Sequence, residues 1–309
     1  MNFTVRELNE NFVNACEDGN LELAHQISQN NPNLNISTDY NYYAFRWSCC
    51  YGHLNVAQWL LKVNPNINIS YDNESVFRMC CFYGKLEVAQ WLLNVKPNID
   101  ISAENEFAFR HSCKNGHLHV AQWLLEVKPN IDISANNEYA FRNACYNKYL
   151  QIAQWLLEVK PTIDISADNE FAFINACECR NLDIVYWLLT VKPNIDISAN
   201  NEVAFRTACS TNYLQLAQYL LKVKPNINIS ADNDYAFKWS SAYIHSPVVA
   251  QWLQTLKPFK YSNNFENYIT YKINTDCEES LLFILYSLTC KNYTNNLTPD
   301  LLSNFAKYI

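Results

Sequence analysis

Glycine is scarce in this chain: its 309 residues contain four, Gly19, Gly52, Gly84 and Gly116. A glycine-rich phosphate-binding loop needs several glycines close together, and these four lie about one repeat apart. The chain also lacks the G-x-S-x-G elbow of serine hydrolases and the H-E-x-x-H helix of zinc proteases. The sequence therefore contains none of the short motifs that mark these enzyme classes, and we expect neither a catalytic site nor a cofactor.

Long apolar runs and excess positive charge are missing as well. The densest apolar run, residues 281–286, is far shorter than the ~18 residues that span a bilayer. The first residues include Arg6, Glu7 and Glu10 and no apolar stretch, so we expect no secretion signal. The net charge of −7 disfavours a nucleic-acid binder, which needs a basic stripe. We expect an intracellular protein without a membrane or nucleic-acid partner.

A phenylalanine recurs every 32 residues along most of the chain. The recurring residues are Phe45, Phe77, Phe109, Phe141, Phe173, Phe205 and Phe237. Similar sequence surrounds each of them, as in residues 105–134. A length of 309 residues alone indicates about two domains. A fixed period of this size instead predicts a stacked array of repeats, in which each repeat contacts its neighbours.

Each repeat has the pattern of two helices. Residues 118–127 contain no proline or glycine, and apolar residues recur there at helical spacing on two sides, which predicts a helix sandwiched between neighbours. Residues 108–115 predict a shorter first helix, ended by Gly116. Pro129 stops the second helix, and residues 131–134 alternate like a short extended arm. Asn stands four residues before each Phe, where we expect a tight turn with positive φ.

The twelve cysteines do not form a disulfide pattern. Seven of them occupy one column, four residues after each repeat Phe: Cys16, Cys49, Cys81, Cys113, Cys145, Cys177 and Cys209. Equivalent positions in stacked helices lie roughly 8–10 Å apart, whereas a disulfide needs Cα atoms within about 7 Å. We therefore expect small buried thiols in a reducing compartment.

The repeat resembles the ankyrin repeat. Gly52–Leu61 and Gly116–Leu125 read Gly-His-Leu-x-Val-Ala-Gln-Trp-Leu-Leu, which is similar to the family's G-H-x-x-V-V-x-x-L-L, and Asn137–Cys145 is similar to G-x-T-P-L-H-x-A-A. The resemblance covers residues ~12–258 as eight copies. It departs from the family in its period of 32 instead of 33, in the missing Thr-Pro pair, and in Asn at the loop glycine. The repeat sequences are similar to those of ankyrin proteins from giant DNA viruses of amoebae (mimivirus-like), and this resemblance implies a protein of the host cytoplasm.

The resemblance implies an all-α helical solenoid with short β-turn or hairpin tips. We expect one array over residues 1–258, with an N-terminal cap repeat at ~1–36 and seven further repeats at ~37–258. Residues 259–309 break the period and predict an atypical helical C-terminal cap, with helices at ~278–289 and ~298–308.

The resemblance also implies a non-enzymatic, monomeric scaffold that binds a host or viral protein through its concave face. In the family that face is built from the turn tips and the exposed ends of the first helices. The tips make an acidic ladder, so we expect a partner with a basic surface. At the helix ends, aromatics could anchor a partner or simply shield the helix ends from water. The candidate binding residues are Tyr51, Asp72, Glu74, Phe82, Tyr83, Glu104, Glu106, Lys114, Glu138, Tyr146, Asp168 and Glu170.

Other columns have structural interpretations. The Trp column (Trp59, Trp91, Trp123, Trp155, Trp187 and Trp252) is expected between neighbouring helices. The Arg column (Arg46, Arg78, Arg110, Arg142 and Arg206) is expected to bridge turn carbonyls and acidic side chains. The Lys column before each Pro is expected to be a solvated loop face. The cluster His111, Cys113, His117 and His119 has the residue types of a zinc site, but its positions are structural, and we expect no metal.

An alternative function depends on the end of the chain. Residues 297–302, with Tyr308 and Ile309, faintly resemble the opening of an F-box, such as poxvirus ankyrin proteins carry. This resemblance implies an adaptor that recruits ubiquitin-ligase machinery.

Overall fold

The computed structural model describes residues 5–30, 38–241 and 248–257. Within these residues there are sixteen helices and no strand, which confirms the predicted all-α solenoid. Of the two tip structures expected, a short turn or a hairpin, the hairpin is therefore absent from the described tips. The predicted helices at ~278–289 and ~298–308, the C-terminal cap and the F-box-like segment lie outside the described residues, and so does the end of the predicted array.

The chain forms two compact units, Met1–Asp168 and Asn169–Ile309. The helices of unit 1 are α1 (Val5–Glu17), α2 (Leu21–Asn30), α3 (Thr38–Tyr51), α4 (Leu54–Val63), α5 (Tyr71–Phe82), α6 (Leu86–Val95), α7 (Ala103–Lys114), α8 (Leu118–Val127), α9 (Ala135–Tyr146) and α10 (Leu150–Val159). Helix α11 (Ala167–Glu178) begins at the boundary, and unit 2 continues with α12 (Leu182–Val191), α13 (Ala199–Ser210), α14 (Leu214–Val223), α15 (Ala231–Ser241) and α16 (Val248–Leu256).

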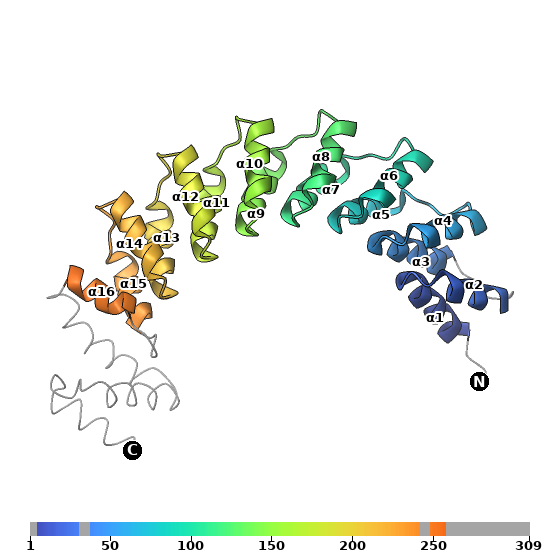
Figure 1. Cartoon of the computed structure of the whole chain (residues 1–309), viewed down its shortest axis with the longest axis horizontal. Coiled ribbons are helices and arrows are strands. Elements are labelled where there is room, and N and C mark those ends of the chain that lie inside the picture. The colour runs from blue at the N-terminus through green and yellow to red at the C-terminus, as the bar shows by residue number, and fades with distance from the viewer. Residues whose placement is uncertain (1–4, 31–37, 242–247, 258–309) are drawn as a thin grey trace, which may run out of the picture. The chain divides into compact units, whose positions relative to one another are not determined.

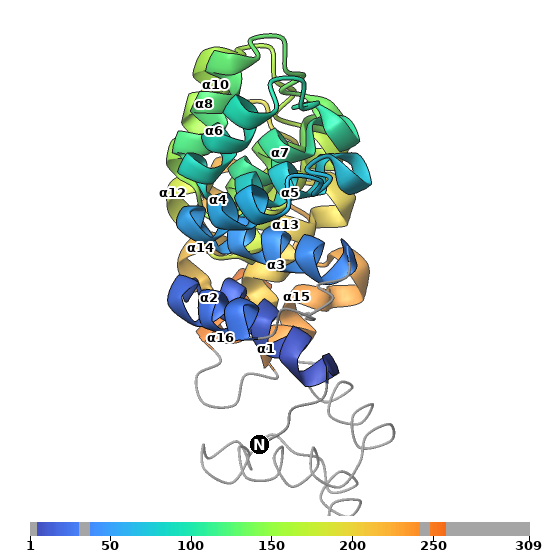
Figure 2. The ribbon, with the colours of Figure 1, turned by 90° about the vertical axis from the view of Figure 1, so that its right-hand side faces the viewer.

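Unit 1 has two layers of helices. Figures 1 and 2 show the second helices α4, α6, α8 and α10 in one layer and the first helices α3, α5, α7 and α9 in the other. The core lies between the layers, where Phe109 of α7 and Val120, Ala121 and Leu124 of α8 are fully buried. Val127, which the helical pattern assigned to an apolar stripe, is 41% exposed, because it ends α8 beyond the packed part of the helix.

The Trp column joins successive repeats, as expected. The ring of Trp91 lies 6.2 Å from the ring of Phe45, which belongs to the preceding repeat, and Trp155 lies at the same distance from Phe109. Within unit 2, Trp252 packs 6.4 Å from Phe205 in the same way. In these pairs each Trp is half-buried and each Phe is fully buried, so an aromatic contact links the repeats at these positions.

The loop between the two helices of a repeat requires a left-handed residue. Gly84 has φ +70°, and a Cβ added to it would lie 2.5 Å from Nδ1 of His117 in the next repeat. Gly116 is equally crowded, because its Cβ would lie 2.7 Å from the ring of Tyr149. Glycine thus supplies the backbone conformation and the space for the next repeat's side chain. Lys148, at the same position one repeat later, is left-handed without being glycine (φ 69°).

The tips are built from three consecutive left-handed residues. In α7 these are Glu104, Asn105 and Glu106, with φ of 57°, 53° and 60°. The positive φ expected at Asn is confirmed, but its two neighbours share it. Left-handed geometry costs ~1–2 kcal/mol per residue outside glycine, so the tip needs compensating contacts. Arg110 supplies two: its Nε donates to Asn105 O at 2.6 Å and its Nη2 to Glu104 O at 3.0 Å.

Four of the five members of the Arg column therefore bridge turn carbonyls, as the sequence predicted, whereas Nε of Arg46 has no such bond among the described residues. Arg78, Arg142 and Arg206 make the same pair of bonds in their own repeats. Arg142 also donates to the carboxylate of Asp168, and Arg206 to that of Asp232, which confirms the expected acidic partners. The Arg lies in the helix turn that follows the tip, and its guanidinium stabilises the strained tip by donating to the tip carbonyls.

Candidate functional site

The glutamates at the tips are buried, which corrects the predicted acidic ladder. Glu74 and Glu106 are each 8% exposed, and Glu138 and Glu170 are each 7% exposed. The third left-handed residue turns its side chain back towards the helix start, where Ser102 Oγ donates to Glu106 Oε1 at 2.6 Å. The amide of Asp132, in the next repeat, donates to the same oxygen at 3.4 Å. These four glutamates are structural acceptors and are unavailable to a partner.

The Lys column takes part in the same cluster. Lys128 Nζ donates to Ser102 Oγ, which itself donates to Glu106. Lys96 reaches Ser70 in the same way, so the expected solvated loop face is wrong for these lysines. Lys160 also has an acidic neighbour, because its Nζ lies 3.8 Å from Oδ1 of Asp132. Serine, glutamate and lysine thus connect the tips of α5, α7 and α9 to the loop of the next repeat.

Three predicted acidic residues remain exposed, and each is already engaged. The carboxylate of Asp72 lies 4.0 Å from Nη2 of Arg78. Glu104 accepts a hydrogen bond from Nδ2 of Asn73 at 2.6 Å, which links neighbouring tips. Asp168 pairs with Arg142. The exposed acids therefore belong to the tip scaffold, and their charge is partly neutralised there.

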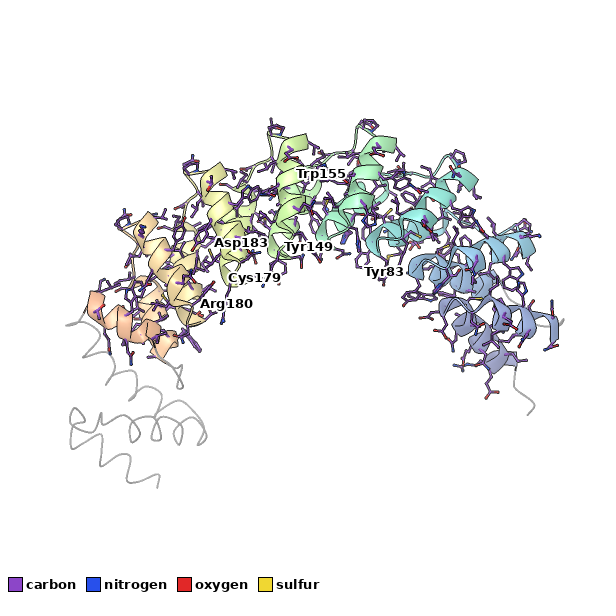
Figure 3. The ribbon with its side chains drawn as sticks, in the orientation of Figure 1. Tyr83, Tyr149, Trp155, Cys179, Arg180 and Asp183 are labelled. Carbon is purple, nitrogen blue, oxygen red and sulfur yellow. The ribbon has the colours of Figure 1, made fainter. Side chains whose placement is uncertain are left out.

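The predicted residues at the ends of the first helices are accessible. Tyr51 is 39% exposed and Tyr146 is 42% exposed, whereas Phe82, Tyr83 and Lys114 are half-buried. Figure 3 shows Tyr83 at the end of α5, at the edge of unit 1 where the first helices end, while Trp155 lies farther along the unit in α10. The structure brings Tyr51 and Tyr83 together, with ring centroids 6.0 Å apart.

A set of rings that the sequence reasoning missed extends this pair. The two positions that lie two residues before and two residues after the repeat Phe are one helical turn apart, so they share one face of the first helix. They place Phe107 against His111 (ring centroids 3.9 Å apart, stacked), and His111 lies 5.3 Å from Tyr139. These columns vary within a copied background, as in Met79, His111 and Asn143, and that variation was the available signal.

The rings form one chain of contacts across α3, α5, α7 and α9. Trp47 stacks on Tyr51, Tyr83 meets Phe82, and Phe82 contacts both Phe107 and His111, at centroid distances of 4.9–6.4 Å. Each ring is half-buried or exposed. We call this set the aromatic strip: Trp47, Tyr51, Phe82, Tyr83, Phe107, His111 and Tyr139.

Cations lie against the middle of the aromatic strip. The guanidinium carbon of Arg78 is 5.0 Å from the Phe107 ring centroid, and that of Arg110 is 4.8 Å from the Tyr139 centroid. Lys114 Nζ donates to Tyr139 Oη at 3.2 Å. Burial, together with the charges of Arg110, Lys114 and Arg78, lowers the pKa of His111 to about 4, so this ring is neutral at pH 7.

Unit 2 has a more polar surface at the equivalent positions. Ser210 ends α13 and Thr211 follows it, and both hydroxyls donate back to the carbonyl of Thr207. Figure 3 places Cys179 and Arg180 at the edge of unit 2. Tyr235 and Trp239 contact each other at 5.8 Å on α15. Unit 2 therefore has polar side chains at several positions where unit 1 has the rings of a continuous strip.

The cysteines and histidines show no site geometry. In the described part of the chain all ten cysteines are free, and all but Cys179 are buried. No group of three His, Cys, Asp or Glu side chains there is placed to hold a metal ion. His117 lies against Gly84, and Cys113 belongs to the buried column. No helix within the described residues is long and apolar enough to cross a membrane.

Comparison with known proteins identifies the repeat. The family profile described as "Ankyrin repeats (3 copies)" matches residues 12–105, 78–169 and 143–233. No curated protein matches the chain. The chain is similar to the crystal structure of the human ASB11 ankyrin repeat domain, with a TM-score of 0.51 and 17% identity over 69% of this chain and 97% of that one. That likeness shows a shared fold. The family profile covers more than half of the sequence, and the chain belongs to the ankyrin repeat family.

Proposed function

We propose that the chain is a non-enzymatic scaffold that binds a protein partner through the first-helix layer of unit 1. Ankyrin repeats generally serve as protein-interaction scaffolds. The observation that carries the proposal is the aromatic strip, because its rings are half-buried or exposed and run without interruption over four repeats. Large aromatic side chains dominate the binding energy of many interfaces.

The expected basic partner loses its support, because four of the tip carboxylates on which it rested are buried. The proposed binding residues are now Tyr51, Phe82, Tyr83 and Lys114 from the original set, with Trp47, Phe107, His111 and Tyr139 added to complete the aromatic strip. Tyr146 is exposed but lies outside the strip. The resemblance to giant-virus proteins supports a host or viral protein as the partner. It supports the cytoplasm of an amoebal host as the place of binding.

Affinity capture from amoebal lysate tests the proposal. Tyr51→Ser combined with Tyr83→Ser removes two accessible rings, and we expect the captured partner to be lost while the helical circular dichroism signal is kept. Lys62→Glu, on the exposed side of α4, is the control and should bind normally. Equal capture by the double variant and the wild type would remove the strip from the binding surface.

The same experiment distinguishes the ligase-adaptor alternative from binding through the aromatic strip. A variant that ends at Pro258 lacks the F-box-like residues 297–302. A partner lost with this truncation and retained by the Tyr51/Tyr83 variant would assign binding to residues 259–309.

A further inference from the structure

We infer that the aromatic strip takes an acidic segment of its partner, with apolar side chains of that segment against Phe82 and Phe107 and a carboxylate at Lys114. The inference rests on the proposed function and specifies the chemistry of the partner. Three observations support it. The rings contact one another without a break, cations lie against them, and Lys114 has no carboxylate within ion-pair distance among the described residues.

The rings around Phe82 make the apolar part of the site. Phe82 contacts Tyr83, Phe107 and His111 at centroid distances of 4.9, 6.4 and 5.7 Å, so it is the point where rings of α5 and α7 meet. All four side chains keep part of their surface in water. Covering such rings with aliphatic or aromatic side chains removes apolar surface from water and is favourable.

Positive charge surrounds these rings. Arg78 lies against Phe107, and Arg110 and Lys114 lie against Tyr139. The two arginines are committed, because their guanidiniums hold the tip carbonyls of their own repeats, and Asp72 and Glu106 lie close to them. They contribute charge to the site and are not free to move towards a partner.

Lys114 is the cation that can meet a partner. Its ammonium donates to the Tyr139 hydroxyl and lies 5.7 Å from that ring's centroid, and among the described residues it has no carboxylate within ion-pair distance. An ammonium has three donors, so two remain for an incoming group. A carboxylate placed there gains a charge-assisted hydrogen bond beside a low-polarity surface.

Both signs of charge lie at the α3 end of the strip. The guanidinium carbon of Arg46 is 5.2 Å from the Trp47 ring centroid, and desolvation followed by the charge of Glu17 raises the pKa of the Tyr51 hydroxyl. The acidic group of the partner is therefore expected towards α7 and α9, where Lys114 lies against Tyr139. Electrostatic complementarity of this kind fixes the direction in which a segment lies on a surface.

Selection of peptides on the full chain tests this inference. The probe is a display library of random 14-residue peptides, selected against the immobilised protein. We expect enriched peptides to carry Asp or Glu within about four residues of Leu, Phe or Trp. Lys114→Glu should weaken binding of such a peptide at least tenfold, and replacing the peptide's acidic residue with Lys should restore binding to this variant. Lys62→Glu makes the same charge change on α4 and should leave affinity unchanged.

The pKa of His111 provides a second readout. It should change if a carboxylate binds at Lys114, and it should not change if Lys114 has only a structural role. A bound carboxylate counters the field of Arg78, Arg110 and Lys114, so the imidazole of His111 should titrate at higher pH in the peptide complex. The measurement is an NMR pH titration of the His111 ring with and without peptide. An unchanged titration would contradict a carboxylate at this position.

The remaining outcomes separate this inference from the proposed function. Enrichment of Lys- and Arg-rich peptides that Phe82→Ser weakens and Lys114→Glu does not would overturn the acidic partner while keeping the strip as a binding surface. Peptides insensitive to both variants would overturn the inference and the proposed face together. Failure to enrich any peptide over an immobilised Tyr51→Ser/Tyr83→Ser variant would overturn the inference, because an extended segment should suffice.

Discussion

Ser102 Oγ lies 2.6 Å from Oε1 of Glu106 and donates a hydrogen bond to it. The pair closes a tip whose three left-handed residues would otherwise be strained. Because the Asp132 amide and Lys128 reach the same cluster from the next repeat, the buried carboxylate of Glu106 couples two repeats. A charge-reversal experiment at this glutamate would therefore perturb folding before it reported on binding.

Glu106→Ala should destabilise the protein by about 1–3 kcal/mol, since it leaves a half-buried hydroxyl and an amide without their acceptor. The measurement is the free energy of unfolding from urea denaturation. Glu126→Ala removes an exposed glutamate of the neighbouring helix α8 and should stay within about 0.5 kcal/mol of wild type. Equal effects of the two variants would show that the Ser102–Glu106 contact contributes little.

The fold could be predicted from Phe109 and the other Phe residues that recur every 32 residues, because this period shows which residues are buried in each repeat. The tip residue Glu106 could not be placed in that way. Asn-Glu reads as an exposed turn, and the burial of the Glu depends on two further left-handed residues and on a lysine 22 positions later. The aromatic strip was missed for a related reason: Phe107 and His111 meet Phe82 through stacking of different repeats, which a single-repeat pattern does not contain.

Gly84→Ala should destabilise the protein by about 2–4 kcal/mol. The new methyl group would occupy a left-handed position and would lie 2.5 Å from the His117 ring. Adding His117→Ala removes the clash, so the double variant should be more stable than the sum of the single changes predicts, leaving mainly the backbone strain. A double-mutant cycle measured by thermal and urea unfolding checks this. Strict additivity would contradict the steric explanation.

Lys148→Gly should have the opposite effect at the same loop position. Lys148 is left-handed (φ 69°), and glycine adopts this conformation without the ~1 kcal/mol penalty. Lys148→Ala is the matched control, because it removes the side chain and keeps the strain. We expect a higher free energy of unfolding for the glycine variant only, and equal stability of both variants would contradict the backbone argument.

His111 makes the stability of unit 1 depend on pH. Its pKa is lowered from 6.5 to about 4 by burial and by Arg110, Lys114 and Arg78, so the folded state favours the neutral ring. The unfolded chain takes up the proton first as the pH falls, and stability should decline from about pH 6.5 down to about pH 4. His111→Phe keeps a ring against Phe107 and should lose less stability over this range. Unfolding curves at pH 7, 5.5 and 4.5 compare the two, with His119→Gln, on the exposed side of α8, as the control. Parallel declines in wild type and His111→Phe would contradict the assignment.

Cys179 should be the first described thiol to react with a disulfide reagent. It is partly exposed, whereas the other nine are buried, and burial raises the pKa of Cys16 and Cys50 to about 12. At pH 8 on the order of 10⁻⁴ of such thiols is ionised, and the thiolate is the reactive form. The experiment uses a Cys277→Ser/Cys290→Ser background, because those two cysteines lie outside the described residues. One fast equivalent is expected in the native protein, and Cys179→Ser should abolish it. Guanidinium chloride should release all remaining thiols, since none is held in a disulfide. A second thiol reacting as fast in the native state would contradict the burial of the cysteine column.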